Sequence, residues 1–313
     1  MTHENLSGTD ISISIIREIS DLKAESDAII LVHNYQRPEL YEIADKIGDS
    51  LELSITAQKS GNKTIVFCGV DFMAETAKIL SPDSRVLHPK PGACCPMAHM
   101  VTPDEIIRLK EKFPSARVVS YVNTTAETKA LSDICCTSAN VKDIINSCDS
   151  DEVIFLPDQN LAAYVRRYTS KQIISGHGDC CVHEGISKRD VETTRLSHPD
   201  TLFIAHPECR PEVIDMADAV CSTGGMVTFC RESSKEAFII GTESGMINRL
   251  KREIPDKKFY PVGGVCLPMK LITLESVKKC LQNGTGEVKL SPGIIRKAGI
   301  PLERMIRISN KAR

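Results

Sequence analysis

Three cysteines occupy the same place in a repeated pattern, and cysteine thiolates are preferred ligands of iron–sulfur clusters and of zinc. Cys95, Cys180 and Cys266 are separated by 85 and 86 residues, and seven residues beyond each stands a serine or threonine suited to begin a helix. Three thiolates that converge on one point would hold a [4Fe–4S] cluster with one iron left open, or a catalytic zinc ion with an open position. Their neighbours Cys94 and Cys181 do not fit this register.

Polar residues with acid–base chemistry follow three apolar runs that are typical of buried strands. His33, Tyr121 and His206 directly follow these runs, and their positions are 88 and 85 residues apart. Ligands of parallel α/β sheets gather at the carboxyl ends of strands, so we expect these three side chains to meet at one site. The two histidines are candidate general acids, bases or donors to a substrate carboxylate. The apolar runs cover residues 28–32, 116–120 and 201–205.

The positions two residues beyond His33, Tyr121 and His206 carry three different functional groups. Tyr35 is a phenol, Asn123 an amide and Glu208 a carboxylate. Different chemistry at equivalent positions indicates a single asymmetric substrate at the centre of a symmetric scaffold. An aspartate also recurs twelve residues beyond each of His33, Tyr121 and His206. These aspartates are Asp45, Asp133 and Asp218.

Hydroxyl side chains recur 17 residues beyond each of His33, Tyr121 and His206, where helix-like stretches begin. They are Ser50, Ser138 and Thr223, the last preceded by Ser222. Serine and threonine at such positions are usually N-caps. At the centre of the molecule they would also bind carboxylate or phosphate groups together with helix N–H groups. Gly224, which follows Thr223, allows the backbone to approach a ligand closely.

The elements that must position these residues alternate between strands and helices, which predicts parallel sheets covered by helices. We expect an α/β fold of three homologous three-layer α/β/α units, arranged as a pseudo-threefold ring around a central site. The predicted units are 1–97 plus 275–313, 98–185 and 186–274. The first unit lacks a helix before its first strand in this prediction, and a helix over 273–282 takes that place. The tail 284–313 is expected to run back over the first unit.

Composition narrows the function classes. The 313 residues carry 39 basic and 41 acidic side chains, so a nucleic-acid-binding surface is not expected. No apolar run is long enough to span a membrane and the start resembles no signal peptide, which favours a cytoplasmic protein. Thirteen cysteines cannot all form internal disulfides. The absence of any CxxC pair argues against zinc ribbons and ferredoxin-type clusters, so the ligands of a metal would come from distant parts of the chain.

Taken together, these segments resemble quinolinate synthase, the iron–sulfur enzyme family of de novo NAD biosynthesis, over nearly the whole chain. The motifs that carry the resemblance are HNYQRPELYEIAD–GDSLELS (33–54), CPM (95–97), SYVNTTAETKALSD (120–133), CTSAN (136–140), FLPDQNLA (155–162), HPECRPEV (206–213), STGGM (222–226) and CLPMKLITLE (266–275). The resemblance implies a [4Fe–4S] cluster held by one cysteine from each unit. It also implies condensation of iminoaspartate with dihydroxyacetone phosphate to quinolinate, phosphate and water, with iminoaspartate supplied by an aspartate-oxidising enzyme.

The resemblance also implies roles for individual residues. His33 and His206 are expected to hydrogen-bond substrate carboxylate or carbonyl groups, and Tyr35 and Glu208 to transfer protons. Tyr121 and Asn123 would position the substrate near the open iron. The residues implied as carboxylate and phosphate binders are Ser50, Ser138, Ser222 and Thr223.

The chain departs from the family pattern near two of the cysteines. Cys181 stands where the family usually has proline, so Cys181 remains an alternative to Cys180 as the middle ligand. His99 stands where an aspartate is common, and the third motif reads Cys-Leu-Pro-Met-Lys in place of Cys-Pro-Asn-Met-Lys. The carboxy-terminal CxxC of some bacterial members is absent.

Two other functions fit three converging thiolates. One is hydroxymethylbutenyl diphosphate reductase, a three-unit enzyme with an open cluster that would need an electron donor and whose local motifs do not match. The other is a non-enzymatic iron–sulfur sensor, which would need a partner- or nucleic-acid-binding surface that the neutral charge does not favour.

Overall fold

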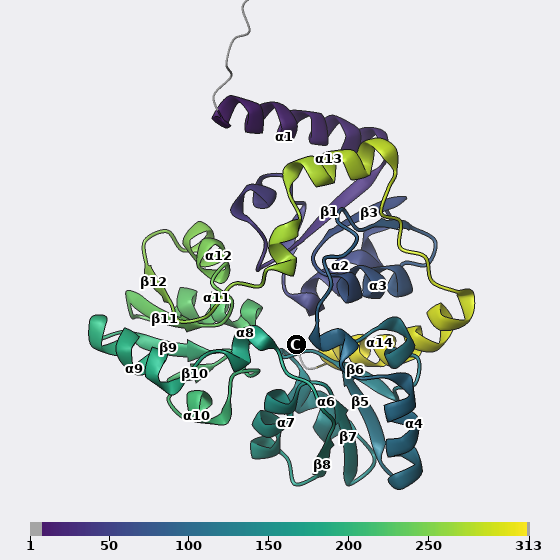
Figure 1. Ribbon diagram of the computed structural model, residues 1–313, viewed down its shortest axis with the longest axis vertical. Coiled ribbons are helices and arrows are strands. Elements are labelled where there is room, and N and C mark those ends of the chain that lie inside the picture. Colours follow the sequence, from purple (N-terminus) through teal and green to yellow (C-terminus); the bar gives the residue numbers. More distant parts are fainter. Residues whose placement is uncertain (1–7, 312–313) are drawn as a thin grey trace, which may run out of the picture.

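The structure, a computed structural model, describes residues 8–311 and contains three four-stranded sheets whose strands are all parallel. Figure 1 shows the sheets and their helices arranged around a common centre, so the predicted α/β fold of three parallel-sheet units is confirmed. The first sheet has the order β2 (Lys46–Gly48), β1 (Ala28–His33), β3 (Thr64–Cys68), β4 (Arg85–Leu87). The second has β6 (Ile134–Cys136), β5 (Arg117–Tyr121), β7 (Glu152–Leu156), β8 (Gln172–Ser175). The third has β10 (Ala219–Val220), β9 (Leu202–Ala205), β11 (Ala237–Gly241), β12 (Lys258–Pro261).

Helices connect the strands of each sheet and cover its faces. The first unit has α1 (Gly8–Glu25), α2 (Ser50–Ser60) and α3 (Asp71–Leu80). The second has α4 (Pro103–Lys112), α5 (Ala126–Lys129), α6 (Val141–Ser147), α7 (Gln159–Val165) and α8 (Cys181–Glu184). The third has α9 (Lys188–Ser197), α10 (Pro211–Ile214), α11 (Thr223–Glu232) and α12 (Met246–Glu253), and the chain ends with α13 (Leu274–Asn283) and α14 (Pro292–Lys311).

The helices that begin after the three cysteines are capped as the sequence predicts. The hydroxyl oxygen of Thr102 accepts a hydrogen bond from the N–H group of Glu105, and Ser187 and Thr273 cap α9 and α13 in the same way. Each cap satisfies a backbone donor that the helix itself leaves unpaired. The three cysteines therefore occupy equivalent positions in the structure as well as in the sequence.

The repeated aspartates have a structural role in all three units. Asp133 Oδ2 accepts from the N–H group of Val118 at 2.8 Å, while its own N–H group donates to the carbonyl oxygen of Val118. The other two copies form the same pair of bonds to a residue of β1 or β9. They are Asp45 with Ile30, at 2.8 Å from N–H to carboxylate, and Asp218 with Phe203, at 2.7 Å. Each aspartate thus fixes the connection that leads from the first strand of its unit to the short edge strand.

The start of the first unit differs from the prediction. A helix, α1, does precede the first strand, and α13 packs against it (Figure 1). Leu274, Val277 and Cys280 of α13 share a buried core with Ile19 of α1 and Ile30 of β1. The amphipathic pattern of α13 therefore completes the first unit, as expected, but beside α1 and not in place of an absent helix.

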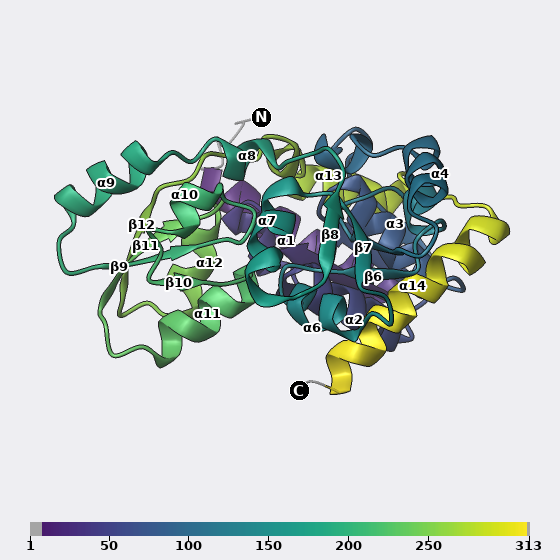
Figure 2. The same ribbon diagram turned by 90° about the horizontal axis from the view of Figure 1, so that it is seen from below.

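The last helix, α14, lies across two units. It packs against α3 of the first unit and against α5, α6 and β6 of the second, along one side of the molecule in Figure 2. Ala298, Leu302 and Met305 are fully buried in this contact. The tail therefore runs back over the first unit, as the sequence led us to expect, and it also covers the junction with the second unit.

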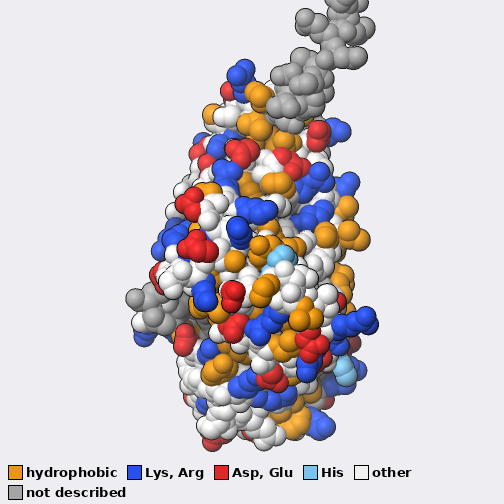
Figure 3. Space-filling view, turned by 90° about the vertical axis from the view of Figure 1, so that its left-hand side faces the viewer, with side chains coloured by type: hydrophobic (Ala, Val, Ile, Leu, Met, Phe, Trp, Pro, Cys, Tyr) orange, Lys and Arg blue, Asp and Glu red, His pale blue; other side chains and the backbone are white. Residues whose placement is uncertain are grey.

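The surface shows no segregation of charge on the face in Figure 3, where basic and acidic side chains are intermixed. This agrees with the near-neutral composition. Within residues 8–311, no helix is both long and apolar enough to cross a membrane.

Candidate active site and metal centre

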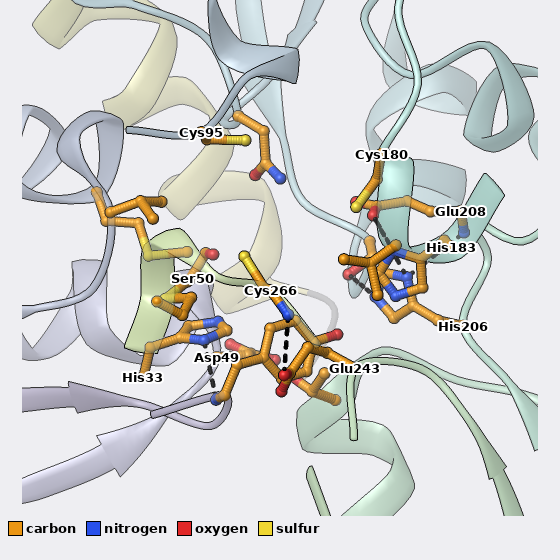
Figure 4. Close-up of a pocket in the computed structure, with 18 of the residues that line it drawn as sticks. His33, Asp49, Ser50, Cys95, Cys180, His183, His206, Glu208, Glu243 and Cys266 are labelled. Atoms are coloured by element: carbon orange, nitrogen blue, oxygen red, sulfur yellow. Dashed lines mark hydrogen bonds and ion pairs between the residues drawn. The ribbon is translucent and has the colours of Figure 1, made fainter. Parts of the chain in front are cut away.

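The three units meet at one pocket, which is lined by residues of all three. Its wall is built from the loops that follow the strands of all three sheets, as Figure 4 shows. Every predicted site residue except Ser222 lines it. These residues are His33, Tyr35, Ser50, Cys95, Tyr121, Asn123, Ser138, Cys180, His206, Glu208, Thr223 and Cys266.

The three cysteines of the common register line this pocket from three sides. Cys95, Cys180 and Cys266 are unpaired and partly buried, and in Figure 4 their sulfur atoms face a common central space. Cys94 and Cys181 are exposed, and no fourth cysteine lines the pocket in the described part of the chain. Burial raises the pKa of the Cys95 thiol to about 12 and also raises that of Cys266. Three thiols without a fourth fit a cluster that keeps one iron open.

His33 and His206 are buried and share one geometry. The Nδ1 atom of His33 accepts a hydrogen bond from the N–H group of Tyr35 at 3.2 Å, and that of His206 accepts from the N–H group of Glu208 at 3.4 Å. Burial lowers the pKa of each histidine to about 3, so both are neutral at pH 7. A neutral imidazole that accepts at Nδ1 carries its proton at Nε2. Both histidines are therefore hydrogen-bond donors at Nε2, and Nε2 of His206 lies 3.2 Å from Ser138 Oγ.

A chain of short polar contacts joins Tyr35 to Glu208 through two residues that the sequence did not single out. Tyr35 Oη lies 2.5 Å from Thr242 Oγ1, and Thr242 Oγ1 lies 2.8 Å from His183 Nε2. The other ring nitrogen of His183, Nδ1, lies 2.7 Å from Glu208 Oε2. Tyr35, His183, Glu208 and Thr242 come from all three units and are buried, apart from a partly buried Tyr35. Within this chain, His183 and Glu208 are arranged as an imidazole and its orienting carboxylate are in a catalytic triad.

Electrostatics set opposite protonation states at the two ends of this chain. Burial and the Glu208 carboxylate raise the pKa of Tyr35 well above its usual range, so the phenol keeps its proton. Burial opposes ionisation of Glu208, but His183, His206 and a hydrogen bond from Tyr121 outweigh it and lower the pKa of Glu208 to about 2. The pair thus holds an available acid and an available base in one pocket.

The predicted anion-binding hydroxyls lie at or near the starts of helices, but not all of them are caps. Ser50 is the first residue of α2, and its neighbour Asp49 caps that helix by accepting from Glu52 N at 2.9 Å. Ser138 lies in the turn before α6. Because Ser50 and Ser138 do not cap their helices, their hydroxyl groups can bind a ligand in the pocket.

Ser222 and Thr223, the hydroxyl residues of the third unit, have different roles. Ser222 caps α11, accepting from Gly225 N at 3.2 Å, and lies outside the pocket lining. Thr223 lines the pocket, and its Oγ1 accepts from Asn34 Nδ2 at 3.0 Å. A side chain at Gly224 would place its Cβ only 2.8 Å from Asp49 Oδ2, so this glycine permits close packing of α11 against the first unit.

One further polar atom is open to a ligand. Asn123 Oδ1 is buried in the wall of the pocket and has no hydrogen-bond partner among the described residues. A buried acceptor without a partner costs about 1–3 kcal/mol, which a donor on a bound molecule would recover. Asn123 is therefore placed to accept a hydrogen bond from a substrate.

Several residues in the pocket or directly beside it carried no signal in the repeat pattern. His183 lies three residues after Cys180, in a motif that drew attention only to the cysteine, and Thr242 and Glu243 follow β11 directly. Asp49 was overlooked because Ser50 occupies the repeated position. Comparing the loops after the second long strand of each unit would have found Glu243, since acids also follow β3 and β7 there.

Comparison with known proteins shows the family of this chain. The family described as quinolinate synthetase A protein matches residues 17–307. Quinolinate synthase of Thermodesulfovibrio yellowstonii is 50% identical over 294 residues, covering 93% of this chain and 97% of that protein. Quinolinate synthase of Methanocaldococcus jannaschii is 48% identical over 307 residues, covering 95% of this chain and all of that protein. Quinolinate synthase 2 of Methanosarcina acetivorans is 50% identical over 297 residues, covering 94% and 96%. The chain therefore belongs to the quinolinate synthase family of enzymes.

Proposed function

We propose that this enzyme condenses iminoaspartate with dihydroxyacetone phosphate to form quinolinate, phosphate and water. The observation that carries the proposal is the convergence in one pocket of three free cysteines with a phenol, an amide and a carboxylate from equivalent positions. Such a pocket suits a reaction of asymmetric substrates. The identity of the two substrates is inferred from the family to which the chain belongs. An aspartate-oxidising enzyme would provide iminoaspartate, and quinolinate would enter NAD biosynthesis.

Cys95, Cys180 and Cys266 would hold a [4Fe–4S] cluster. When bound, the cluster supplies one iron without a protein ligand, which acts as a Lewis acid on a substrate hydroxyl or carbonyl group. The register of the repeat and the position in the pocket both favour Cys180 over the exposed Cys181.

The protein side chains bind and orient the substrates. The Nε2–H groups of His33 and His206 donate to carboxylate or carbonyl oxygens, because both imidazoles are neutral. Ser50, Ser138 and Thr223 add hydroxyl donors for carboxylate and phosphate groups, as hydroxyls and N–H groups near helix starts do elsewhere. These donors suit anionic substrates, which both proposed substrates are.

Proton transfer runs through the chain of polar contacts described above. Tyr35 keeps its proton and donates it to an oxygen that leaves the substrate. The hydroxyl of Thr242 lies between Tyr35 Oη and His183 Nε2, where it can relay a proton between the two side chains. Glu208 lies 2.7 Å from His183 Nδ1 and orients the imidazole, as the carboxylate of a triad does.

A direct assay tests the function. The protein is purified without oxygen and reconstituted with iron and sulfide, and quinolinate formation from the two substrates is measured together with iron and acid-labile sulfide. We expect about four of each per chain and quinolinate production. A protein that binds the cluster and forms no quinolinate would refute the function and favour a sensor.

Metal analysis of the same sample addresses the alternative cofactor. Cys180 Sγ, a ring nitrogen of His183 and a carboxylate oxygen of Glu208 lie within 4.8 Å of one another, a donor set that zinc also accepts. If the sample contains one zinc ion per chain and no acid-labile sulfide, the pocket holds a mononuclear zinc site and not a cluster.

A further inference from the structure

Three side chains of metal-binding types lie together outside the central pocket. They are Asp71, the first residue of α3, Cys94, which directly precedes Cys95, and His99, at the end of the 3-10 turn Met97–His99. A carboxylate oxygen, a sulfur and a ring nitrogen, one from each residue, all lie within 4.8 Å of one another. None of the three residues lines the central pocket, so this Asp71–Cys94–His99 group is separate from the site described above.

Backbone hydrogen bonds hold the three residues together. The N–H group of Asp71 donates to the carbonyl oxygen of Ala93 at 3.0 Å, and Asp71 Oδ1 accepts from the N–H group of Cys95 at 3.1 Å. Asp71 therefore binds the chain on both sides of Cys94. The 3-10 turn after Cys95 then brings His99 back toward the same carboxylate.

The two oxygens of the Asp71 carboxylate have different partners. Oδ1 accepts from the N–H groups of Cys95 and of Phe72, the latter at 2.9 Å, whereas Oδ2 lies 2.8 Å from His99 Nε2. Carboxylates that ligate metals are commonly hydrogen-bonded in this way, because bonds to one oxygen fix the orientation of the other. Oδ2 is therefore held in place as a ligand atom.

The group is open to solvent. The side chain of His99 is 53% exposed and that of Asp71 is 23% exposed, and Cys94 is an exposed free cysteine. A metal ion can reach the three ligand atoms without unfolding of the chain, and water can complete its coordination.

The types of ligand atom identify the kind of ion. Zinc binds thiolate sulfur, imidazole nitrogen and carboxylate oxygen in tetrahedral sites, often with three protein ligands and one water molecule. Magnesium and calcium prefer oxygen ligands alone, so a site with sulfur and nitrogen does not suit them. Binding of zinc releases the proton of the Cys94 thiol to solvent, since the thiolate is the ligand.

We propose that Asp71, Cys94 and His99 form a binding site for one zinc ion. The ion joins the first turn of α3 to the loop that leads into Cys95, and so fixes one predicted cluster ligand from outside the pocket. The proposal goes beyond the proposed function and does not depend on it, because no ligand of this site belongs to the pocket.

Variants at the two exposed ligands test the site. Cys94→Ser and His99→Ala each remove one ligand, whereas Asp71 is left unchanged because it also holds the backbone of Cys95. Cys181→Ser is the matched control. Cys181 is likewise exposed and adjacent to a predicted cluster ligand, but it belongs to no comparable group of ligand atoms in the part of the chain that the structure describes.

The experiment uses enzyme reconstituted with iron and sulfide, dialysed against buffered zinc, and measures zinc per chain beside iron and acid-labile sulfide. We expect wild type and Cys181→Ser to bind one zinc ion that Cys94→Ser does not bind. His99→Ala should bind this ion at least about tenfold more weakly, because loss of a residue that only supports a ligand already lowers metal affinity by about 10–100-fold.

X-ray absorption at the zinc edge identifies the atoms around the ion. The expected shell has one sulfur at about 2.3 Å and nitrogen or oxygen ligands at about 2.0–2.2 Å. Two or more sulfur ligands would place the zinc at the three predicted cluster ligands and refute the proposal. The residues Cys180, His183 and Glu208 offer the same atom types in the pocket, and the loss of zinc in Cys94→Ser distinguishes the two sites.

The comparison between wild type and Cys94→Ser decides the proposal whether or not the cluster is present. If wild type carries no iron and sulfide, the proposed cofactor fails, but the difference in zinc content between the two proteins still counts only the ion at Cys94. Equal zinc content in wild type and Cys94→Ser would refute the zinc site. Loss of the same ion in Cys181→Ser would refute it as well.

Discussion

Removing the hydroxyl group of Thr242 should abolish most of the activity and leave the pocket intact. Thr242 is fully buried, and valine has nearly the same shape. In Thr242→Val, Tyr35 Oη and His183 Nε2 both lose the partner that now lies 2.5 and 2.8 Å away. Proton transfer by positioned groups contributes about 10²–10⁴-fold to enzyme rates, so we expect kcat to fall by about that factor.

The same substitution has a separate cost in stability. Two buried polar groups are left without a partner, at about 1–3 kcal/mol each, which gives about 2–6 kcal/mol. Urea unfolding of the variant measures this term. Thr242→Ser keeps the hydroxyl group and is the matched control, so it should retain turnover within about tenfold of wild type.

The assay compares quinolinate formation at equal iron and sulfide content, so that loss of the cofactor is not mistaken for loss of proton transfer. Substrate is supplied at saturation, because the argument concerns kcat and not KM. If Thr242→Val turns over within about threefold of wild type at full cluster content, the chain from Tyr35 to His183 carries no proton and the reasoning is wrong.

Three further predictions concern the cluster, the histidines and the terminal helix. Alanine at any one of the three register cysteines should abolish acid-labile sulfide, whereas Cys181→Ala should retain it; the reverse result would reassign the middle ligand. Because burial holds the pKa of His33 near 3, the unfolded chain binds a proton that the folded chain does not between pH 6.5 and 4, so stability falls on acidification. His33→Asn should reduce that fall by about 3 kcal/mol in urea unfolding curves, and identical curves for both proteins would contradict the assignment. Leu302→Ala in α14 should cost about 2–5 kcal/mol of unfolding free energy, and a cost below 1 kcal/mol would show that the helix is loosely attached.

The parts of the fold that repeat at a fixed spacing could be predicted from the sequence. The long strands follow from apolar runs, and the capped helices after the cysteines follow from Thr102, Ser187 and Thr273. The pocket followed as well, because residues after parallel strands meet at one edge of the sheet. Twelve of the thirteen predicted site residues line it.

What could not be predicted lacks a fixed spacing or a local pattern. The carboxylates of Asp71, Asp158 and Glu243, which accept from the N–H groups of the three cysteines, precede those cysteines by 24, 22 and 23 residues, since loops of different length connect the same contact points. The edge strands β2, β6 and β10 have three, three and two residues, too few to show alternation. The bonds of Thr242 to two other units depend on the packing of the units, which no single stretch of sequence encodes.

The position of α13 bears on how the chain is made. Each sheet is built from consecutive residues and could form as soon as that stretch leaves the ribosome. The core around Ile30 also needs Ile272 and Leu274, which are synthesised only after the second and third units are complete. The first unit to emerge is therefore the last to be finished, and until then one face of its sheet remains without part of its cover.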